Sequence, residues 1–247
     1  MKIEFIDKSD DNVTLLLKET NPTEVNMIRR MIIDEVPTLA IEDVNFIKNS
    51  SALYDEIIAH RMGLIAIKTD LKSYDLPKNC KGKKKGEDVC TKENCPHHSV
   101  LFTLKSAGPT KDGETKIVYA EELVCKDKKI IAVHPKTPIV KLLKKHNLEV
   151  EARAVMGQGK DHMKFTPGTV YYRGLPSIKI GSVKHPESIA QVCPRKVYDI
   201  NGGKLKVTDP NQCILCKACV DASEGKIEVK ASDKDFIFNI ESWGQLT

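Results

Sequence analysis

The stretch NPTEVNMIRRMIIDEVP, residues 21–37, predicts the helix around which the rest of the fold is arranged. Asn21 can cap it, Pro22 suits the first helical position, and Glu24 stands where a capping box needs a carboxylate. Pro37 ends it. The apolar residues cover more than one stripe: Val25, Met27, Ile28, Met31, Ile32, Ile33 and Val36. We expect one side to pack on its own sheet and another to face a partner helix, the alternative being a deeply buried helix.

Strands are expected on both sides of this helix. Residues 1–8 and 12–20 read as two strands joined by a Ser9-Asp10-Asp11 turn, because apolar and polar residues alternate in the second. The tail also returns to strand, with alternating Phe236, Phe238 and Ile240. Between them we predict strands over 38–48, 99–105, 116–123, 129–135, 148–155 and 169–173, a short helix over 53–64, and a short strand or helical turn over 139–146. The fold class is therefore α+β, a sheet with one or two helices and two insertions.

Composition excludes several classes of protein. The chain has 247 residues, a formal net charge of +5, 5% aromatic residues and a single Trp. So few aromatic side chains argue against a surface that stacks on the bases of single-stranded nucleic acid. The net charge is too small to imply nucleic-acid binding by itself. No apolar run approaches the roughly 18 residues of a membrane helix, and the N-terminus lacks a signal-peptide core. We expect a soluble cytoplasmic protein with no membrane contact.

The strongest motif is a group of four cysteines. Cys213, Cys216 and Cys219 have the C-x2-C-x2-C spacing by which bacterial-type ferredoxins hold three corners of an iron–sulfur cluster. The fourth ligand there is a remote Cys-Pro, and Cys193-Pro194 stands twenty residues before Cys213. We predict one iron–sulfur cluster, [4Fe–4S] or [3Fe–4S], on these four residues. A four-cysteine zinc site and a set of reduced thiols are the alternatives.

A second cluster is not expected. The half-repeat of a two-cluster ferredoxin would place its other triad at Val183, Pro186 and Ile189, and its other Cys-Pro at Ser223-Glu224. All four ligands are absent together, so a chain of electron hops between two clusters is not predicted.

A second group of cysteines lies in a Lys- and Gly-rich loop over about 75–98. Cys80, Cys90 and Cys95 with His97 offer three thiolates and one imidazole, the donors of a tetrahedral zinc site. The spacing is loose, so a solvated basic loop with incidental thiols stays an equal alternative. Cys125 is expected to be an inert thiol.

No catalytic motif is found. Gly157-Gln-Gly159-Lys160 lacks the spacing and the Ser/Thr of a phosphate-binding loop and is expected to be a turn. His60 is expected to be a packing or interface residue, and His162 has no catalytic partner within sequence reach. Arg29-Arg30 is expected to pair with acidic groups across an interface. The run Lys81–Lys85 is expected to be a solvated face, with a stand-alone nucleic-acid binder as the alternative. We predict no catalytic residue in this chain.

Four blocks in this order resemble subunit 3 of archaeal DNA-directed RNA polymerase, which is of the α/D type. They are NPTEVNMIRRMIIDEVPTLAIEDV, DEIIAHRMGLIAI, GKDHMKFTPGTVYY and FIFNIESWGQL. That family is related to the N-terminal domain of the bacterial α subunit. The resemblance covers nearly the whole chain, and its members are non-catalytic assembly subunits of the nucleotidyltransferase complex.

The resemblance implies three parts. Residues 1–42 with 225–247 would form a discontinuous dimerisation subdomain, 43–177 a mixed-sheet insert subdomain carrying the 75–98 loop, and 178–224 a ferredoxin-like domain. Helix 22–36 would pair with subunit L. The protein would form the platform for small subunits N and P and the large catalytic subunits, with little direct DNA contact. Residues 53–67 and 157–172 would take part in contacts with those subunits.

The resemblance also assigns the cluster to Cys193, Cys213, Cys216 and Cys219 and implies a structural role for it. Two departures stand out. Related subunits have closely spaced cysteines near position 80, whereas here they are wider apart, and they continue past ESWGQL into a long helix that completes the dimer. An iron–sulfur electron-transfer protein or oxidoreductase subunit is the alternative function, and it predicts a second redox site.

Overall fold

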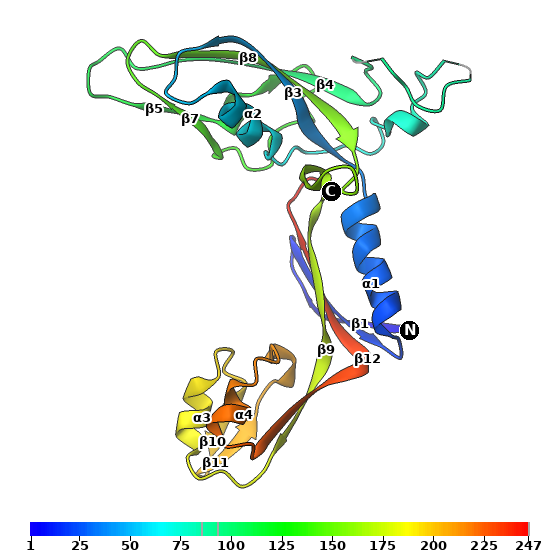
Figure 1. Cartoon of the computed structure of the whole chain (residues 1–247), viewed down its shortest axis with the longest axis vertical. Coiled ribbons are helices and arrows are strands. Elements are labelled where there is room, and N and C mark those ends of the chain that lie inside the picture. The colour runs from blue at the N-terminus through cyan, green and yellow to red at the C-terminus, as the bar shows by residue number, and fades with distance from the viewer. Residues whose placement is uncertain (85, 93, 247) are drawn as a thin grey trace. The chain divides into compact units, whose positions relative to one another are not determined.

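The computed structural model describes residues 1–84, 86–92 and 94–246 and divides the chain into two compact units (Figure 1). The first unit is Met1–Arg29 with Val170–Glu241, and the second is Arg30–Thr169 with Ser242–Thr247. In this division residues 30–42 and 242–246 fall in the second unit, and residues 170–177 fall in the first. The predicted ferredoxin-like part, 178–224, lies within the first unit, so the three predicted ranges stay a prediction. Lys85, at the end of the predicted basic run, lies outside the described residues.

The first unit is built on a four-stranded sheet in the order β1-β2-β12-β9. Its strands are β1 (Lys2–Lys8), β2 (Asn12–Lys18), β12 (Ile227–Ser242) and β9 (Gly168–Ile180). The expected turn joins β1 to β2, with the Ser9 N–H donating to the Asn12 carbonyl over 2.8 Å. Leu17 on β2 is opposite Phe236 on β12, whose ring stands edge-on to Tyr172 at 5.8 Å. Strand β1 is exposed along its whole length.

The predicted helix begins and ends where the sequence indicated. It consists of α1 (Pro22–Arg30) followed by a π-helical segment, Met31–Glu35. The Asn21 side chain accepts from the Glu24 N–H over 3.0 Å, and Val36 is already extended before Pro37. Val25 is fully buried, whereas Met27 and Met31 are each 55% exposed. The alternative of a deeply buried helix is therefore wrong.

The rest of the first unit lies between β9 and β12. It contains α3 (Pro186–Val192), β10 (Tyr198–Asn201), β11 (Lys204–Val207) and α4 (Ala218–Ala222), with a short 3-10 turn at Pro210–Gln212. Helices α3 and α4 pack on each other and α3 also contacts the β10–β11 hairpin. The small core here is shared by aliphatic residues and cysteines: Ile189, Val197, Tyr198, Leu205, Cys213, Cys219, Ile227 and Val229.

The second unit is built on an antiparallel sheet in the order β3-β8-β4-β6. Its strands are β3 (Thr38–Asn49), β8 (Asn147–Gly157), β4 (Ser99–Ala107) and β6 (Val124–Cys125). Every second residue of β8 is buried, as period-two patterning predicts. Helix α2 (Asp55–Gly63) contacts β3 and buries Ile58 and Met62 in the main core.

The remaining elements of the second unit correct one prediction. Strands β5 (Lys116–Tyr119) and β7 (Pro138–Leu142) pair with each other, which decides the 139–146 segment in favour of strand. The predicted strand over 129–135 is wrong: this segment makes a single bridge, Ile67 to Ala132. Its apolar residues pack into the core instead, since Ile130 is 1% exposed. Short 3-10 turns occupy Pro77–Asn79, Ala120–Glu122 and Met163–Phe165. Within the described residues, no helix is long and apolar enough to cross a membrane.

Candidate metal centres

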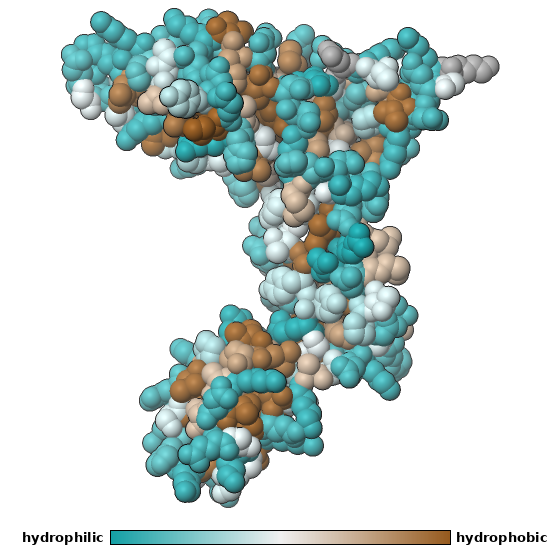
Figure 2. Space-filling view, in the orientation of Figure 1, coloured by the Kyte–Doolittle hydropathy of each residue, from teal (hydrophilic) through white to brown (hydrophobic). Residues whose placement is uncertain are grey.

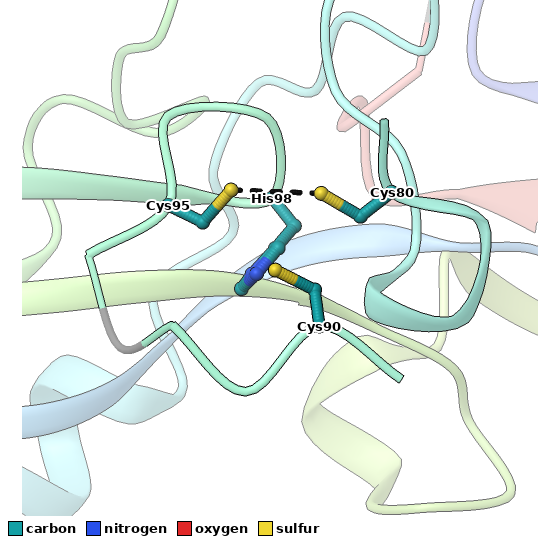
Figure 3. A group of neighbouring side chains, drawn as sticks. All are labelled: Cys80, Cys90, Cys95 and His98. Atoms are coloured by element: carbon teal, nitrogen blue, oxygen red, sulfur yellow. Dashed lines mark hydrogen bonds between the residues drawn. The ribbon is translucent and has the colours of Figure 1, made fainter. Parts of the chain in front are cut away.

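Cys80, Cys90, Cys95 and His98 come together in the second unit as a buried group with converging side chains (Figure 3). One ligand atom from each lies within 4.8 Å of all the others, and the Sγ atoms of Cys80 and Cys95 are 3.5 Å apart. Four ligands held tetrahedrally at ~2.3 Å around zinc stand about 3.8 Å apart. The group therefore has the size and donor set of a site for a single tetrahedral metal ion.

The histidine of this group is His98, whereas the sequence prediction used His97, which is exposed. The turn after Cys95 decides between them. The His98 and Ser99 N–H groups both donate to the Cys95 carbonyl, and the Met156 N–H on β8 donates to the His98 carbonyl over 2.9 Å. This pairing holds His98 at the start of β4 with its side chain inward. The C-x2-H spacing, like a two-residue zinc knuckle, was the signal that could have found it.

The environment of the His98 ring fits the role of a metal ligand. Its side chain is 4% exposed, and neither Nδ1 nor Nε2 has a hydrogen-bond partner among the residues that the structure describes. Burial lowers the pKa of His98, which favours the neutral imidazole. A buried imidazole without partners is costly unless a lone pair is used, and metal coordination uses it.

The pKa values of two thiols in the group shift in opposite directions. Burial raises the pKa of Cys80 to about 11. At Cys95 the opposing effect of burial is outweighed by hydrogen bonds from the His97 backbone and the neighbouring thiols, which lower its pKa. The Gly82 N–H donates to Cys80 Sγ over 3.2 Å, and a Cβ at Gly82 would come within 3.0 Å of Cys95 Sγ. The loop thus closes tightly around the sulfur atoms.

Cys193, Cys213, Cys216 and Cys219 line one pocket of the first unit, together with Pro194, Arg195, Val197, Tyr198, Ile214 and Lys217. The four residues come from the end of α3, the turn after Pro210–Gln212, and α4. Cys213 and Cys219 are buried, and Cys216 is exposed. Tertiary structure therefore gathers the residues that the ferredoxin spacing singled out.

Backbone groups around this pocket point at the sulfur atoms. The N–H groups of Val197 and Leu215 donate to Cys193 and Cys213 Sγ, each over 3.5 Å. Residues with left-handed backbone recur in each segment: Lys196 (φ 50°), Leu215 (φ 61°) and Lys217 (φ 63°). Such conformations are costly for residues other than glycine and collect at functional sites. N–H donors to sulfur are characteristic of iron–sulfur ligation.

Tyr198 belongs to this pocket, although sequence reasoning did not single it out. Its hydroxyl donates to Cys219 Sγ over 3.1 Å, and burial, followed by this hydrogen bond, raises its pKa. Apolar residues gather over α3 and α4 in the space-filling view (Figure 2). Val192, the last residue of α3, is 44% exposed, and Ile214, which follows Cys213, is 47% exposed.

The other residues weighed in the sequence lie apart from these groups. His60 is exposed near the end of α2. His162 is exposed and accepts the Lys164 N–H at Nδ1 over 3.1 Å. Arg30 was expected to pair with an acidic group across an interface. Its Nε instead lies 3.1 Å from Oδ2 of Asp34, four residues along the same chain. Cys125 is half-buried, and burial raises its pKa.

A polar connection at the end of the Met31–Glu35 segment was not foreseen. Lys160 Nζ lies 2.9 Å from the Glu35 carboxylate, and the Gln158 side chain contacts both Glu35 and Lys78. The hydrogen bond from Lys160 is the largest cause of a lowered pKa at Glu35. Nothing in the spacing of these four residues indicated that they meet.

The comparisons with known proteins identify the class first. The family described as RNA polymerase Rpb3/RpoA insert domain matches residues 41–169, nearly the whole second unit. The chain thus carries the insert domain of RNA polymerase subunits of the Rpb3/RpoA type.

Relatives along the full chain narrow the class. DNA-directed RNA polymerase subunit Rpo3 of Methanosphaera stadtmanae is 36% identical over 252 residues, which cover 100% of this chain and 90% of the relative. Subunit Rpo3 of Methanobrevibacter smithii is 36% identical over 263 residues, 100% of this chain and 89% of the relative. Subunit Rpo3 of Archaeoglobus fulgidus is 30% identical over 247 residues, which cover 99% of this chain and 88% of the relative. The chain belongs to the archaeal Rpo3 family of DNA-directed RNA polymerase subunits. This confirms the resemblance and disfavours the electron-transfer alternative.

Proposed function

We propose that this polymerase subunit is non-catalytic and serves assembly. It pairs with subunit L through helix 22–36 and forms the platform on which small subunits N and P and the large catalytic subunits gather. It touches little DNA itself. The observation that carries the proposal is the unpartnered apolar surface of the helix.

Large apolar side chains are exposed on the helix and on strand β1. Met27 and Met31 lie one turn apart and are each 55% exposed, and β1 adds Ile3 at 54% and Phe5 at 70%. Exposed large apolar side chains that gather into a patch mark interaction sites, and the helix and β1 each present two. Met27 and Met31 are at i and i+4, the spacing by which one helix presents a stripe to another.

Co-expression with subunit L from the same genome, followed by size-exclusion chromatography, tests the pairing. We expect a 1:1 complex with the wild-type chain, and loss of the complex with Ile28→Asp or Ile32→Asp. Both isoleucines are half-buried beside the exposed methionines, so circular dichroism must show that the variants fold. A folded Ile32→Asp chain that still pairs would refute this interface, and so would a wild-type chain that stays monomeric.

The same proposal assigns one iron–sulfur cluster to Cys193, Cys213, Cys216 and Cys219. The order strand, helix, two strands, helix, strand from β9 to β12 supports it, because this is the order of ferredoxin-like folds. The N–H groups aimed at sulfur support it as well. A bound cluster would cross-link the end of α3 to α4 in a part of the unit with few aliphatic core residues. Its role is therefore structural.

Zinc is assigned to Cys80, Cys90, Cys95 and His98, since three thiolates and one imidazole within 4.8 Å suit a closed tetrahedral site. The unpartnered ring nitrogens of His98 are the observation that favours a metal over reduced thiols.

Two variants, Cys213→Ala and Cys90→Ala, prepared without oxygen and analysed for iron, sulfide and zinc, test the two assignments separately. We expect the first to lose only iron and sulfide and the second only zinc. Any other distribution refutes the assignment concerned.

A further inference from the structure

Both ends of the Gln158 side-chain amide are engaged in the second unit. Gln158 is 5% exposed and follows β8. Its Oε1 accepts from Lys78 Nζ over 3.0 Å, and its Nε2 donates to the Glu35 carbonyl over 2.6 Å and to Glu35 Oε2 over 3.1 Å. One buried amide therefore links the turn Pro77–Asn79 with the C-terminal end of the segment Met31–Glu35.

The helix end needs this contact. The last carbonyls of a helix have no partner within it, and Val36 is already extended. The loop after β8 supplies the partners. Thr166 Oγ1 donates to the Ile33 carbonyl over 3.4 Å. The Lys160 N–H donates to the Asp34 carbonyl over 3.2 Å. The Gln158 side chain donates to the Glu35 carbonyl. The 157–166 loop is thus the C-terminal cap of the Met31–Glu35 segment.

The other end of the bridge adjoins the candidate zinc group. Lys78 is two residues before Cys80, and the carbonyl of the preceding Pro77 accepts from the Cys90 N–H over 3.0 Å. Cys80, Cys90 and Cys95 form a buried cluster of their own, separate from the main core of the unit. Since no aliphatic side chain from the described part of the chain belongs to that cluster, a metal ion would supply most of the order of this turn.

We propose that Gln158 is a positioning residue through which zinc bound at Cys80, Cys90, Cys95 and His98 strengthens the cap of the Met31–Glu35 segment. The inference rests on the proposed zinc site and bears on the proposed pairing helix. Metal fixes the Pro77–Cys90 turn, the turn holds Lys78 Nζ at Gln158 Oε1, and the amide then keeps Nε2 on the Glu35 carbonyl. Release of Lys78 frees the amide to rotate and weakens the cap.

Hydrogen exchange of the full chain tests this coupling without a partner subunit. Zinc-loaded and chelator-treated samples are compared in the peptide that contains the Lys160 N–H, whose acceptor is the Asp34 carbonyl. We expect exchange there to be about fivefold faster without zinc, the effect of one hydrogen bond of ordinary strength. Zinc content and the cobalt–thiolate absorption of a cobalt-substituted sample report separately whether the site is filled.

Variants identify the route. Gln158→Leu and Lys78→Met should each abolish the zinc dependence of this exchange while still binding zinc, whereas the exposed controls Gln191→Leu and Lys72→Met should retain it. Lys160→Met removes a metal-independent contact to Glu35 and should speed exchange equally in both samples.

The outcomes separate the two proposals. A wild-type chain that binds zinc but shows equal exchange in both samples overturns the coupling alone. A folded Gln158→Leu chain with the full zinc dependence also overturns it. A chain that binds no zinc overturns both the coupling and the zinc site.

Discussion

The Sγ atoms of Cys80 and Cys95 lie 3.5 Å apart although fourteen residues separate them in sequence. This separation is close to the ~3.8 Å between neighbouring ligands of a tetrahedral zinc ion. His98 completes the group from the position just before β4, and within the described residues both of its buried ring nitrogens are without hydrogen-bond partners. Metal binding should therefore depend on this histidine.

His98→Ala should weaken zinc binding more than the ~10- to 100-fold that loss of an outer-shell partner costs, because it removes a ligand. His97→Ala should leave zinc affinity nearly unchanged, since His97 is exposed. Competition with a chromophoric chelator measures both affinities. The reverse order of effects would restore the sequence-based choice of His97.

Met27→Asp and Met31→Asp should abolish pairing with subunit L and leave the iron–sulfur absorption intact. A carboxylate on a stripe that is 55% exposed costs little in the isolated chain but must be desolvated in an interface. Thr23→Asp, on the exposed first turn of the same helix, is the matched control and should pair normally. Gel filtration of each of the three variants with subunit L measures complex formation. Normal pairing by both methionine variants would place the interface elsewhere.

Tyr198→Phe should lower the midpoint potential of the proposed iron–sulfur cluster. The Tyr198 hydroxyl donates to Cys219 Sγ over 3.1 Å, and such a bond favours the more negative, reduced cluster. Spectroelectrochemical titration measures the shift, with exposed Tyr54→Phe as control. An unchanged potential in a fully loaded Tyr198→Phe chain would mean that the hydroxyl does not interact with a ligand sulfur.

Gly159→Ala should destabilise the second unit by about 1–3 kcal/mol, the usual cost of overpacking. A Cβ there would overlap with the Ile33 carbonyl oxygen, which is backbone and cannot move aside cheaply. At Gly63 a Cβ would meet its nearest neighbour at an ordinary 3.5 Å, so Gly63→Ala is the tolerated control. Denaturant titration followed by the fluorescence of Trp243, the single Trp, reports on this unit.

The stability of the second unit should fall in acid partly through Glu122. Burial, which raises its pKa, is outweighed by hydrogen bonds from Lys116 and Ser106, so the pKa lies below its ordinary value of about 4.5. A lowered pKa contributes stability above about pH 4.5, and this contribution is lost as pH falls through the folded value. The contribution is up to about 1 kcal/mol, because Lys116 is partly exposed.

Glu122→Gln should therefore reduce the difference in unfolding free energy between neutral and acid solution. Glu114→Gln removes an exposed carboxylate and should preserve that difference. Equal pH dependence in the wild-type and Glu122→Gln chains would show that other carboxylates account for the acid sensitivity.

Several elements could be read from short stretches of sequence. Asn21, Pro22 and Pro37 mark both ends of the helix, because caps and proline act on neighbouring backbone groups. Apolar and polar residues alternate in β2 and β8, and this alternation, which is also a local property of the sequence, predicted half-buried strands. The segment 129–135 has similar apolar content but forms no strand. Its apolar residues are used in packing, which periodicity alone does not reveal.

The sequence by itself determined the helix that we propose for pairing and the cysteines to consider, since caps, spacing and periodicity are properties of neighbouring residues. Tertiary structure alone decided that His98 rather than His97 faces Cys80, because the strand β8 sets the position of the turn after Cys95. It also decided that Gln158 meets Lys78 and Glu35, residues 80 and 123 positions away. Such meetings depend on how strands pair across the sheet, and strand pairing is a property of the whole chain.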